Sequence, residues 1–224
     1  MKTNLIIVEG LPGSGKSTTA ARIAEELRKH GRHVVCVDEG EPGHPADVSD
    51  YDFPDFETER RSILGKWRDF TEKARRDTIY IFNCIFLQNP MCETMMRFDM
   101  AEAASRDYIA EISEIIKPLN PVILYIDYPD VKGAIDAVLG ERGNEWLDAV
   151  IAYHTEQGYG KQNGLAGYKG YIKCLEERKA RELRILQTLD IESHRISRLL
   201  GFAQTHQGRY PWTPPPFEKG GPKL

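Results

Sequence analysis

Short apolar runs alternate along this chain with longer segments in which apolar residues recur every three or four positions. The apolar runs have the length of single strands and lie at residues 5–8, 34–37, 78–82 and 122–126. The segments with helical periodicity lie at residues 16–30, 56–74 and 109–119. Because strands that alternate with helices pair in parallel, the pattern predicts an α/β fold with a doubly wound parallel sheet. The first two strands are expected to be buried.

The second half of the chain is less regular. Helices are expected near residues 131–139 and 146–154, followed by a mobile loop at residues 157–167 with four glycines and a long helix over residues 168–189. A fifth strand at residues 191–196 is left open, because Glu192, His194 and Arg195 would make it a poor buried strand.

The length of 224 residues suits one domain with a substantial core. We expect this domain at residues 1–203, with a substrate flap at about residues 39–76 and a helical lid at about residues 141–170. Residues 204–224 are rich in proline and glycine and poor in periodic apolar residues, which predicts a disordered tail.

Composition limits the class of function. The net charge of -4 offers no attraction for nucleic acid, and no window holds the roughly 20 apolar residues of a membrane span. The four cysteines form no CxxC pair, as is typical of free thiols in a reducing compartment. These features predict a cytoplasmic protein that acts on small molecules and binds neither nucleic acid nor membranes.

Residues 10–17 carry the most specific motif of the chain. Their sequence, GLPGSGKS, matches the Walker A pattern GxxxxGK[ST] and lies between a predicted strand and a predicted helix. Glycines let successive N–H groups converge on phosphates, helped by the positive end of the following helix. We expect Lys16 to neutralise the β and γ oxygens, Ser17 to ligate Mg²⁺, and Thr18, rather than Thr19, to contact the α-phosphate. The predicted nucleotide-binding residues are Gly10, Leu11, Pro12, Gly13, Ser14, Gly15, Lys16, Ser17 and Thr18.

With this motif the chain resembles the P-loop kinases, which include nucleoside and nucleotide kinases and antibiotic-modifying phosphotransferases. The resemblance covers roughly residues 3–189 and is specific only at the P-loop. It implies a five-stranded parallel sheet, a flap after the second strand and a lid after the fourth. The NKxD motif of Ras-like GTPases is absent from the sequence, and the chain is too short for a full AAA module, so a kinase-like catalyst is the leading choice. The expected nucleotide is ATP, and GTP is left open.

Further stretches within residues 39–47, 82–91 and 153–160 resemble a group of bacterial P-loop proteins. That group lends no residue roles, so the remaining roles follow from position in the fold.

Polar residues follow the second, third and fourth strands, at the edge where ligands of open α/β sheets bind. An acid after the second strand of a small-molecule kinase commonly accepts the proton of the acceptor hydroxyl. Asp38 and Glu39 compete for this catalytic role, and we favour Glu39. Asp127 has a Walker B-like position, which suits either a magnesium-bound water or a structural part. Asn83 offers an amide to a hydroxylated acceptor.

Kinases of this type usually place arginines over the γ-phosphate when the lid closes. Arg142 is the first candidate, followed by Arg178 and Lys161. Arg178 has a plainer alternative, an ion pair with Glu182 four residues further on. Lys179 lies in the apolar stripe of its helix, where a cation invites a phosphate or carboxylate partner. The plainer alternative is that its side chain extends along the helix so that the ammonium group reaches solvent.

Nine acidic residues and no lysine or arginine lie between positions 38 and 59. An anionic flap repels phosphorylated acceptors, so we expect an uncharged or cationic acceptor with a hydroxyl group. The sequence thus predicts an ATP-dependent small-molecule kinase that uses Mg²⁺. The competing interpretation is a P-loop NTPase that acts as a nucleotide-dependent regulatory or binding protein and responds to a protein partner.

Overall fold

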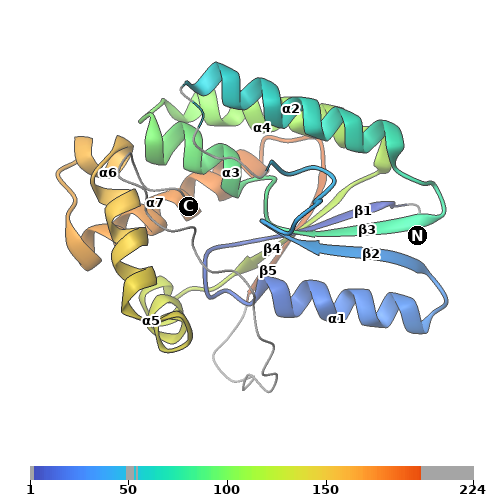
Figure 1. Cartoon of the computed structure of the whole chain (residues 1–224), viewed down its shortest axis with the longest axis horizontal. Helices are drawn as coiled ribbons and strands as arrows, with labels where there is room; N and C mark the ends of the chain where they lie inside the picture. Colours follow the sequence, from blue (N-terminus) through green and yellow to red (C-terminus); the bar gives the residue numbers. More distant parts are fainter. Residues whose placement is uncertain (1–2, 49–52, 54, 198–224) are drawn as a thin grey trace.

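The computed structural model describes residues 3–48, 53 and 55–197. The expected tail at residues 204–224 lies outside the described residues. One sheet of five parallel strands runs through the centre of the molecule in the order β2-β3-β1-β4-β5 (Figure 1). Its strands are β1 (Leu5–Glu9), β2 (His33–Asp38), β3 (Thr78–Asn83), β4 (Val122–Asp127) and β5 (Glu192–Ser197). This is the α/β, doubly wound parallel sheet that the alternation predicts.

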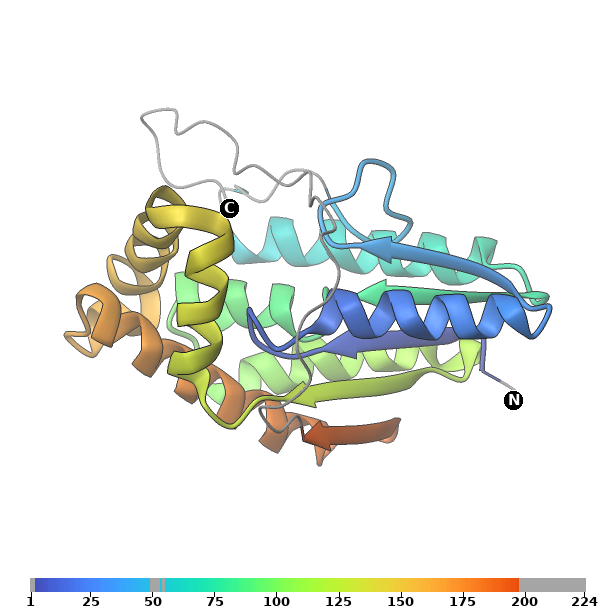
Figure 2. The ribbon, with the colours of Figure 1, turned by 90° about the horizontal axis from the view of Figure 1, so that it is seen from below.

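Helices cover both faces of the sheet and one of its ends. They are α1 (Lys16–Lys29), α2 (Phe56–Lys73), α3 (Gln88–Met91), the π-helix η1 (Cys92–Arg97), α4 (Glu102–Ile116), the 3₁₀-helix η2 (Lys117–Leu119), α5 (Val131–Thr155), α6 (Gly158–Gln162) and α7 (Gly167–Leu186). Helix α1 lies on one face, and α2 and α4 lie on the other (Figure 1). The strands point toward α5, α6 and α7, which gather beyond their carboxyl ends (Figure 2). Within the described residues, no helix combines the length and the apolarity needed to cross a membrane.

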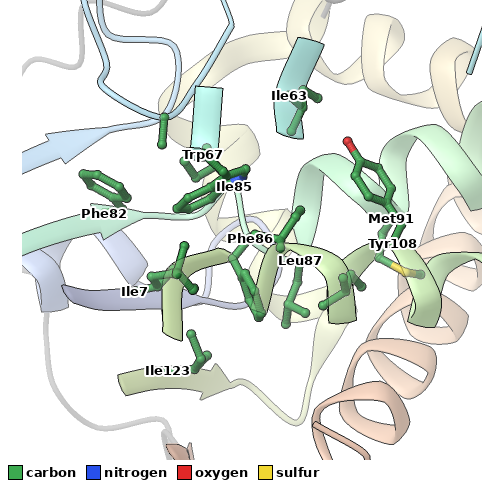
Figure 3. Close-up of a cluster of buried hydrophobic side chains, with 14 of the residues drawn as sticks. Ile7, Ile63, Trp67, Phe82, Ile85, Phe86, Leu87, Met91, Tyr108 and Ile123 are labelled. Atoms are coloured by element: carbon green, nitrogen blue, oxygen red, sulfur yellow. The ribbon is translucent and has the colours of Figure 1, made fainter. Parts of the chain in front are cut away.

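Alternation along β1 divides the core into two layers. Ile6 and Val8 join the apolar cluster beneath α1. Leu5 and Ile7 join the larger cluster formed with α2, α4 and the segment after β3, part of which Figure 3 shows around Trp67. A third cluster holds α5 and α7 together and includes Leu11 of the P-loop, so the helical end of the molecule packs directly on the phosphate-binding segment.

The two edge strands, β2 and β5, are where the structure goes beyond the prediction from the sequence. The prediction of a buried second strand is wrong, because β2 lies at an edge of the sheet and Val35 is 40% exposed. The fifth strand that the sequence left open is present: β5 pairs in parallel with β4, with Leu124 opposite His194. All six residues of β5 are exposed, which explains how polar side chains are tolerated there.

The glycine-rich segment at residues 157–167 is partly helical, because it contains α6 and the first residue of α7. A Cβ atom on Gly158 would lie 2.0 Å from the carbonyl oxygen of Met96, and one on Gly160 would lie 1.9 Å from that of His154. These glycines therefore permit close backbone contact with η1 and the end of α5. The prediction of a loop is wrong for residues 158–162, which form α6, and holds for residues 163–166 between α6 and α7.

Candidate functional site

The P-loop connects β1 to α1 in a conformation that requires glycine. Gly10, Gly13 and Gly15 have φ angles of 142°, 77° and 90°. A Cβ atom at Gly10 would lie 2.6 Å from the carbonyl oxygen of Ile126, and one at Gly13 would lie 2.5 Å from that of Ala134. The loop is thus fixed between β4 and α5 in a shape that only glycine adopts without strain.

The N-terminus of α1 is suited to receive phosphate. Within the described part of the chain, no side chain caps this terminus and no acidic residue lies in its first turn. Lys16 is folded over the loop and donates to the carbonyl oxygen of Leu11 at 3.2 Å. The hydroxyl of Thr19 donates back to Gly15 at 2.9 Å. The orphan N–H groups and the ammonium group together match the charge and the hydrogen-bonding needs of a polyphosphate.

Asp38 and Glu39 are adjacent in the sequence but have different neighbours at the carboxyl ends of the strands. Asn83, the register partner of Asp38 at the end of β3, donates to the Ser17 hydroxyl at 2.7 Å. Burial raises the pKa of Asp38, while a hydrogen bond from Asn83 and the charge of Lys16 oppose the rise. Asp38 is therefore the acid on the Ser17 side. Ser17 is placed where a hydroxyl ligand for Mg²⁺ is expected, and Asn83 already holds its oxygen atom.

Glu39 contacts Gln88 and lies near several positively charged side chains. Its carboxylate accepts a hydrogen bond from the side-chain amide of Gln88. Burial raises the pKa of Glu39, and the positive charges of Lys16, Arg178 and Arg142 act against that rise. The guanidinium of Arg142 also lies 5.2 Å from the ring centroid of Trp146. The structure thus brings Glu39 within electrostatic range of both predicted arginines and of the P-loop lysine.

Asp47 anchors the segment that follows Glu39. The Asp47 carboxylate is buried and accepts from the backbone N–H of Gly40 at 3.2 Å and from the Asn89 amide at 3.1 Å. This pair of contacts ties residues 40–47 to α3, so the beginning of the expected flap has a fixed attachment to that helix. No sequence motif signals the contact.

Asp127 is held by two cations. Lys179 lies 3.1 Å from its Oδ1 atom, and Arg195 of β5 donates from Nε to its Oδ2 atom at 2.8 Å. Burial acts to raise the pKa of Asp127, but the hydrogen bonds from Arg195 and Lys179 outweigh it and lower the pKa. The prediction that Lys179 finds an anionic partner is confirmed. For Asp127 the geometry favours the structural part over the magnesium role, because its carboxylate is neutralised by protein groups.

Glu9 is a functional candidate that sequence reasoning missed. It ends β1, immediately before the P-loop, and is fully buried. Its Oε1 atom accepts from the backbone N–H groups of Phe86 and Leu87, both at 2.8 Å. These donors follow Cys84 and Ile85, whose φ angles are 72° and 77°. Two successive non-glycine residues with positive φ are strained, and the buried carboxylate stabilises the turn.

Burial, together with the negative charge of Glu182, raises the pKa of Glu9 to about 7, although the Leu87 N–H and the charges of Lys16 and Arg178 act to lower it. The folded protein therefore binds this proton more tightly than the unfolded chain does. Its contribution to stability is complete below pH 4.5 and is lost as the pH rises through about 7, with a total loss of about 3 kcal/mol.

Glu9→Gln should remove this pH dependence, because the amide oxygen can still accept from both N–H groups but does not ionise. The measurement is the free energy of unfolding in urea from pH 5 to pH 8 for wild type and variant. Glu156→Gln, which alters an exposed carboxylate, is the control. Parallel stability curves for wild type and Glu9→Gln would contradict the assignment.

Arg178 belongs to a buried series of hydrogen-bonded side chains. It is 2% exposed and donates from Nε to Glu182 at 2.6 Å, as the plainer alternative for this residue predicts. The other oxygen of Glu182 accepts from the Tyr125 hydroxyl at 2.7 Å. One Arg178 Nη atom reaches the side-chain oxygen of Gln88 at 3.5 Å. Lys161 lies on α6, and no described contact connects it with Arg178 or Glu39.

The parallel sheet, the glycine-dependent loop and the Walker A residues together define a P-loop NTPase fold. A protein-family model described as "Chromatin associated protein KTI12" matches residues 3–112, just under half of the chain. The matched part contains the P-loop, Asp38 and Glu39, and Gln88. The search of the curated proteins gave no match. Among solved structures, the YorR protein of Bacillus subtilis, in complex with phosphorylated GDP, is 15% identical with a TM-score of 0.47, over 86% of this chain and 85% of that chain.

Proposed function

We propose that this protein is an ATP-dependent phosphotransferase that transfers the γ-phosphate to a hydroxyl group of a small acceptor. The observation that carries the proposal is the placement of Glu39 within reach of the charge of Lys16 and of two arginines at the carboxyl ends of the strands. A carboxylate in this position has no part in binding phosphate, which it repels, but it suits an acceptor hydroxyl that must lose a proton.

In the proposed reaction the acceptor oxygen attacks the γ-phosphorus and the bond from that phosphorus to the bridging oxygen breaks, so that ADP leaves. Glu39 receives the proton of the hydroxyl. Lys16 neutralises charge on the phosphate oxygens, and Arg142 supplies further positive charge from α5. Bound Mg²⁺, with Ser17 as its protein ligand, would supply the remaining neutralisation. Arg178 acts from below the crevice through its electrostatic effect on Glu39.

The acceptor is proposed to be uncharged or cationic. Asp38 and Glu39 at the end of β2, with the buried Asp47, give this region three carboxyl groups, and Asp47 raises the pKa of Glu39 through its negative charge. An acceptor that already carries phosphate would add to this repulsion, whereas an amine or a neutral hydroxyl compound would not. A cytoplasmic location belongs to the same proposal, and all four cysteines are free.

A regulatory P-loop NTPase is the second candidate function. The description of the matched family concerns chromatin association rather than metabolism, which favours a partner-dependent role. Such a protein would hydrolyse nucleotide slowly and would respond to a macromolecular partner instead of a small acceptor.

The expected result for the first candidate is nucleotide turnover that rises when an acceptor is present. Purified protein is screened by thermal shift with ATP or GTP and Mg²⁺, and then for ADP release with a panel of nucleosides, sugars and aminoglycosides. A phosphorylated acceptor detected by mass spectrometry would support the kinase. Basal hydrolysis unaffected by every class of hydroxyl acceptor, but stimulated by a protein partner, would contradict it.

A further inference from the structure

Gln88 connects the proposed base to the buried series of hydrogen-bonded side chains that includes Arg178, and it does so with both halves of its side-chain amide. Its nitrogen donates to the Glu39 carboxylate. Its oxygen faces Arg178 at 3.5 Å and the Cys84 thiol at 3.1 Å. Gln88 thus lies between the end of β2 and helix α7, which are far apart in the sequence.

The orientation of the Gln88 amide is fixed by what surrounds its oxygen atom. Arg178 carries only donors. The Cys84 thiol carries one proton and has two acceptors in reach, the Gln88 oxygen at 3.1 Å and Glu9 Oε2 at 3.5 Å, so it is compatible with this orientation but does not fix it. The NH₂ group has no acceptor on the Arg178 side. The amide nitrogen must therefore point to Glu39, whose carboxylate is an acceptor.

Arg178 is itself held in place, so the orientation of Gln88 does not depend on a mobile side chain. Glu182 binds the Arg178 Nε atom and is in turn bound by Tyr125 of β4. Both ionic partners are buried, at 2% and 0% exposure. Charge-assisted hydrogen bonds between buried groups restrict rotamers strongly. Tyr125 thus anchors this series of hydrogen bonds to the sheet, and the amide of Gln88 is its last member.

We propose that Gln88 is a positioning residue for Glu39: its amide, oriented by Arg178, holds the carboxylate toward the P-loop and favours its ionised form. Only the expected effect of Gln88 on catalysis rests on the proposed function. The contact with Glu39 and its effect on ionisation are properties of the protein alone, and they are measured without an acceptor.

The test is the pKa of the Glu39 side chain in wild type and in Gln88→Met, which keeps the length of the side chain but removes the amide. The pKa is followed by the ¹³C chemical shift of δ-labelled glutamate, assigned through Glu39→Gln. A carboxylate that loses an N–H donor should titrate higher, by about one pH unit. The acidic limb of the kcat profile should move by the same amount, while the KM for the nucleotide stays unchanged.

Gln88→Asn provides a second variant should the methionine disturb folding, because it retains an amide beside Arg178 but withdraws the donor from Glu39. Gln162→Met on the exposed surface of α6 is the control and should leave the pKa unchanged. An unchanged Glu39 pKa in the folded Gln88 variant overturns the inference. A raised Glu39 pKa in the Gln88 variants supports the positioning role even if the wild-type protein phosphorylates no acceptor. The latter result would count against the proposed kinase and not against the contact between Gln88 and Glu39.

Discussion

Lys16→Ala is expected to lower nucleotide turnover by at least about a hundredfold, because it removes the cation that neutralises the phosphates during transfer. The fold should survive, since the Lys16 ammonium makes one described hydrogen bond, to the carbonyl oxygen of Leu11 at 3.2 Å. Loss of that bond costs about 1 kcal/mol. The measurements are steady-state ADP release and the unfolding midpoint of the same preparation.

Lys29→Ala is the matched control for this prediction. It removes another lysine from α1, but one that is exposed at the far end and pairs only with surface carboxylates such as Glu25. Activity at the level of wild type is expected there. A folded Lys16→Ala protein with normal turnover would refute the P-loop as the site of nucleotide chemistry.

Glu39→Gln should reduce acceptor-dependent turnover by about a hundredfold or more, because the amide keeps the shape of the side chain but accepts no proton. The affinity for the nucleotide should change little. The decisive measurement is single-turnover transfer with saturating nucleotide, together with the nucleotide Kd from titration. These two quantities separate the chemical step from binding.

Asp38→Asn and Glu41→Gln complete this comparison. Asp38 is linked to Ser17 through Asn83, so its variant should affect the affinity for the magnesium nucleotide more than the transfer step. Glu41 is exposed, and its amide could still accept from the backbone of Asp38, so its variant should resemble wild type. If Glu39→Gln and Asp38→Asn weaken nucleotide binding equally while transfer per bound nucleotide persists, both acids belong to the metal environment and the assignment of the base is wrong.

The sequence predicted the central strands to within one residue, because apolar runs of that length, alternating with periodic helices, have one main structural solution. It failed where packing between distant segments decides the structure. Gly158 and Gly160 resemble loop residues in a local pattern, yet they allow α6 to approach Met96 and His154. The π-helix η1 likewise has no local signature that distinguishes it from an α-helix.

The parts of the site that a contiguous motif specifies could be predicted from the sequence, and the parts that depend on contacts between distant segments could not. The P-loop followed from eight consecutive residues, and the acids after β2 followed from the rule that ligands bind at strand ends. Glu9 had a signal that was overlooked: a carboxylate that closes an apolar strand and points to the same side as Leu5 and Ile7. Gln88 and Arg178 meet only because α7 passes beneath the segment after β3, and one sequence does not reveal that crossing.

The polar character of β5 has a consequence for the behaviour of the protein in concentrated solution. Glu192, His194 and Arg195 lie on a strand whose six residues are all exposed. The backbone of an outermost strand can recruit a strand from another molecule, but charged side chains on that strand disfavour such pairing. The residues that make this segment a poor buried strand therefore oppose intermolecular β-pairing along it, and with it aggregation.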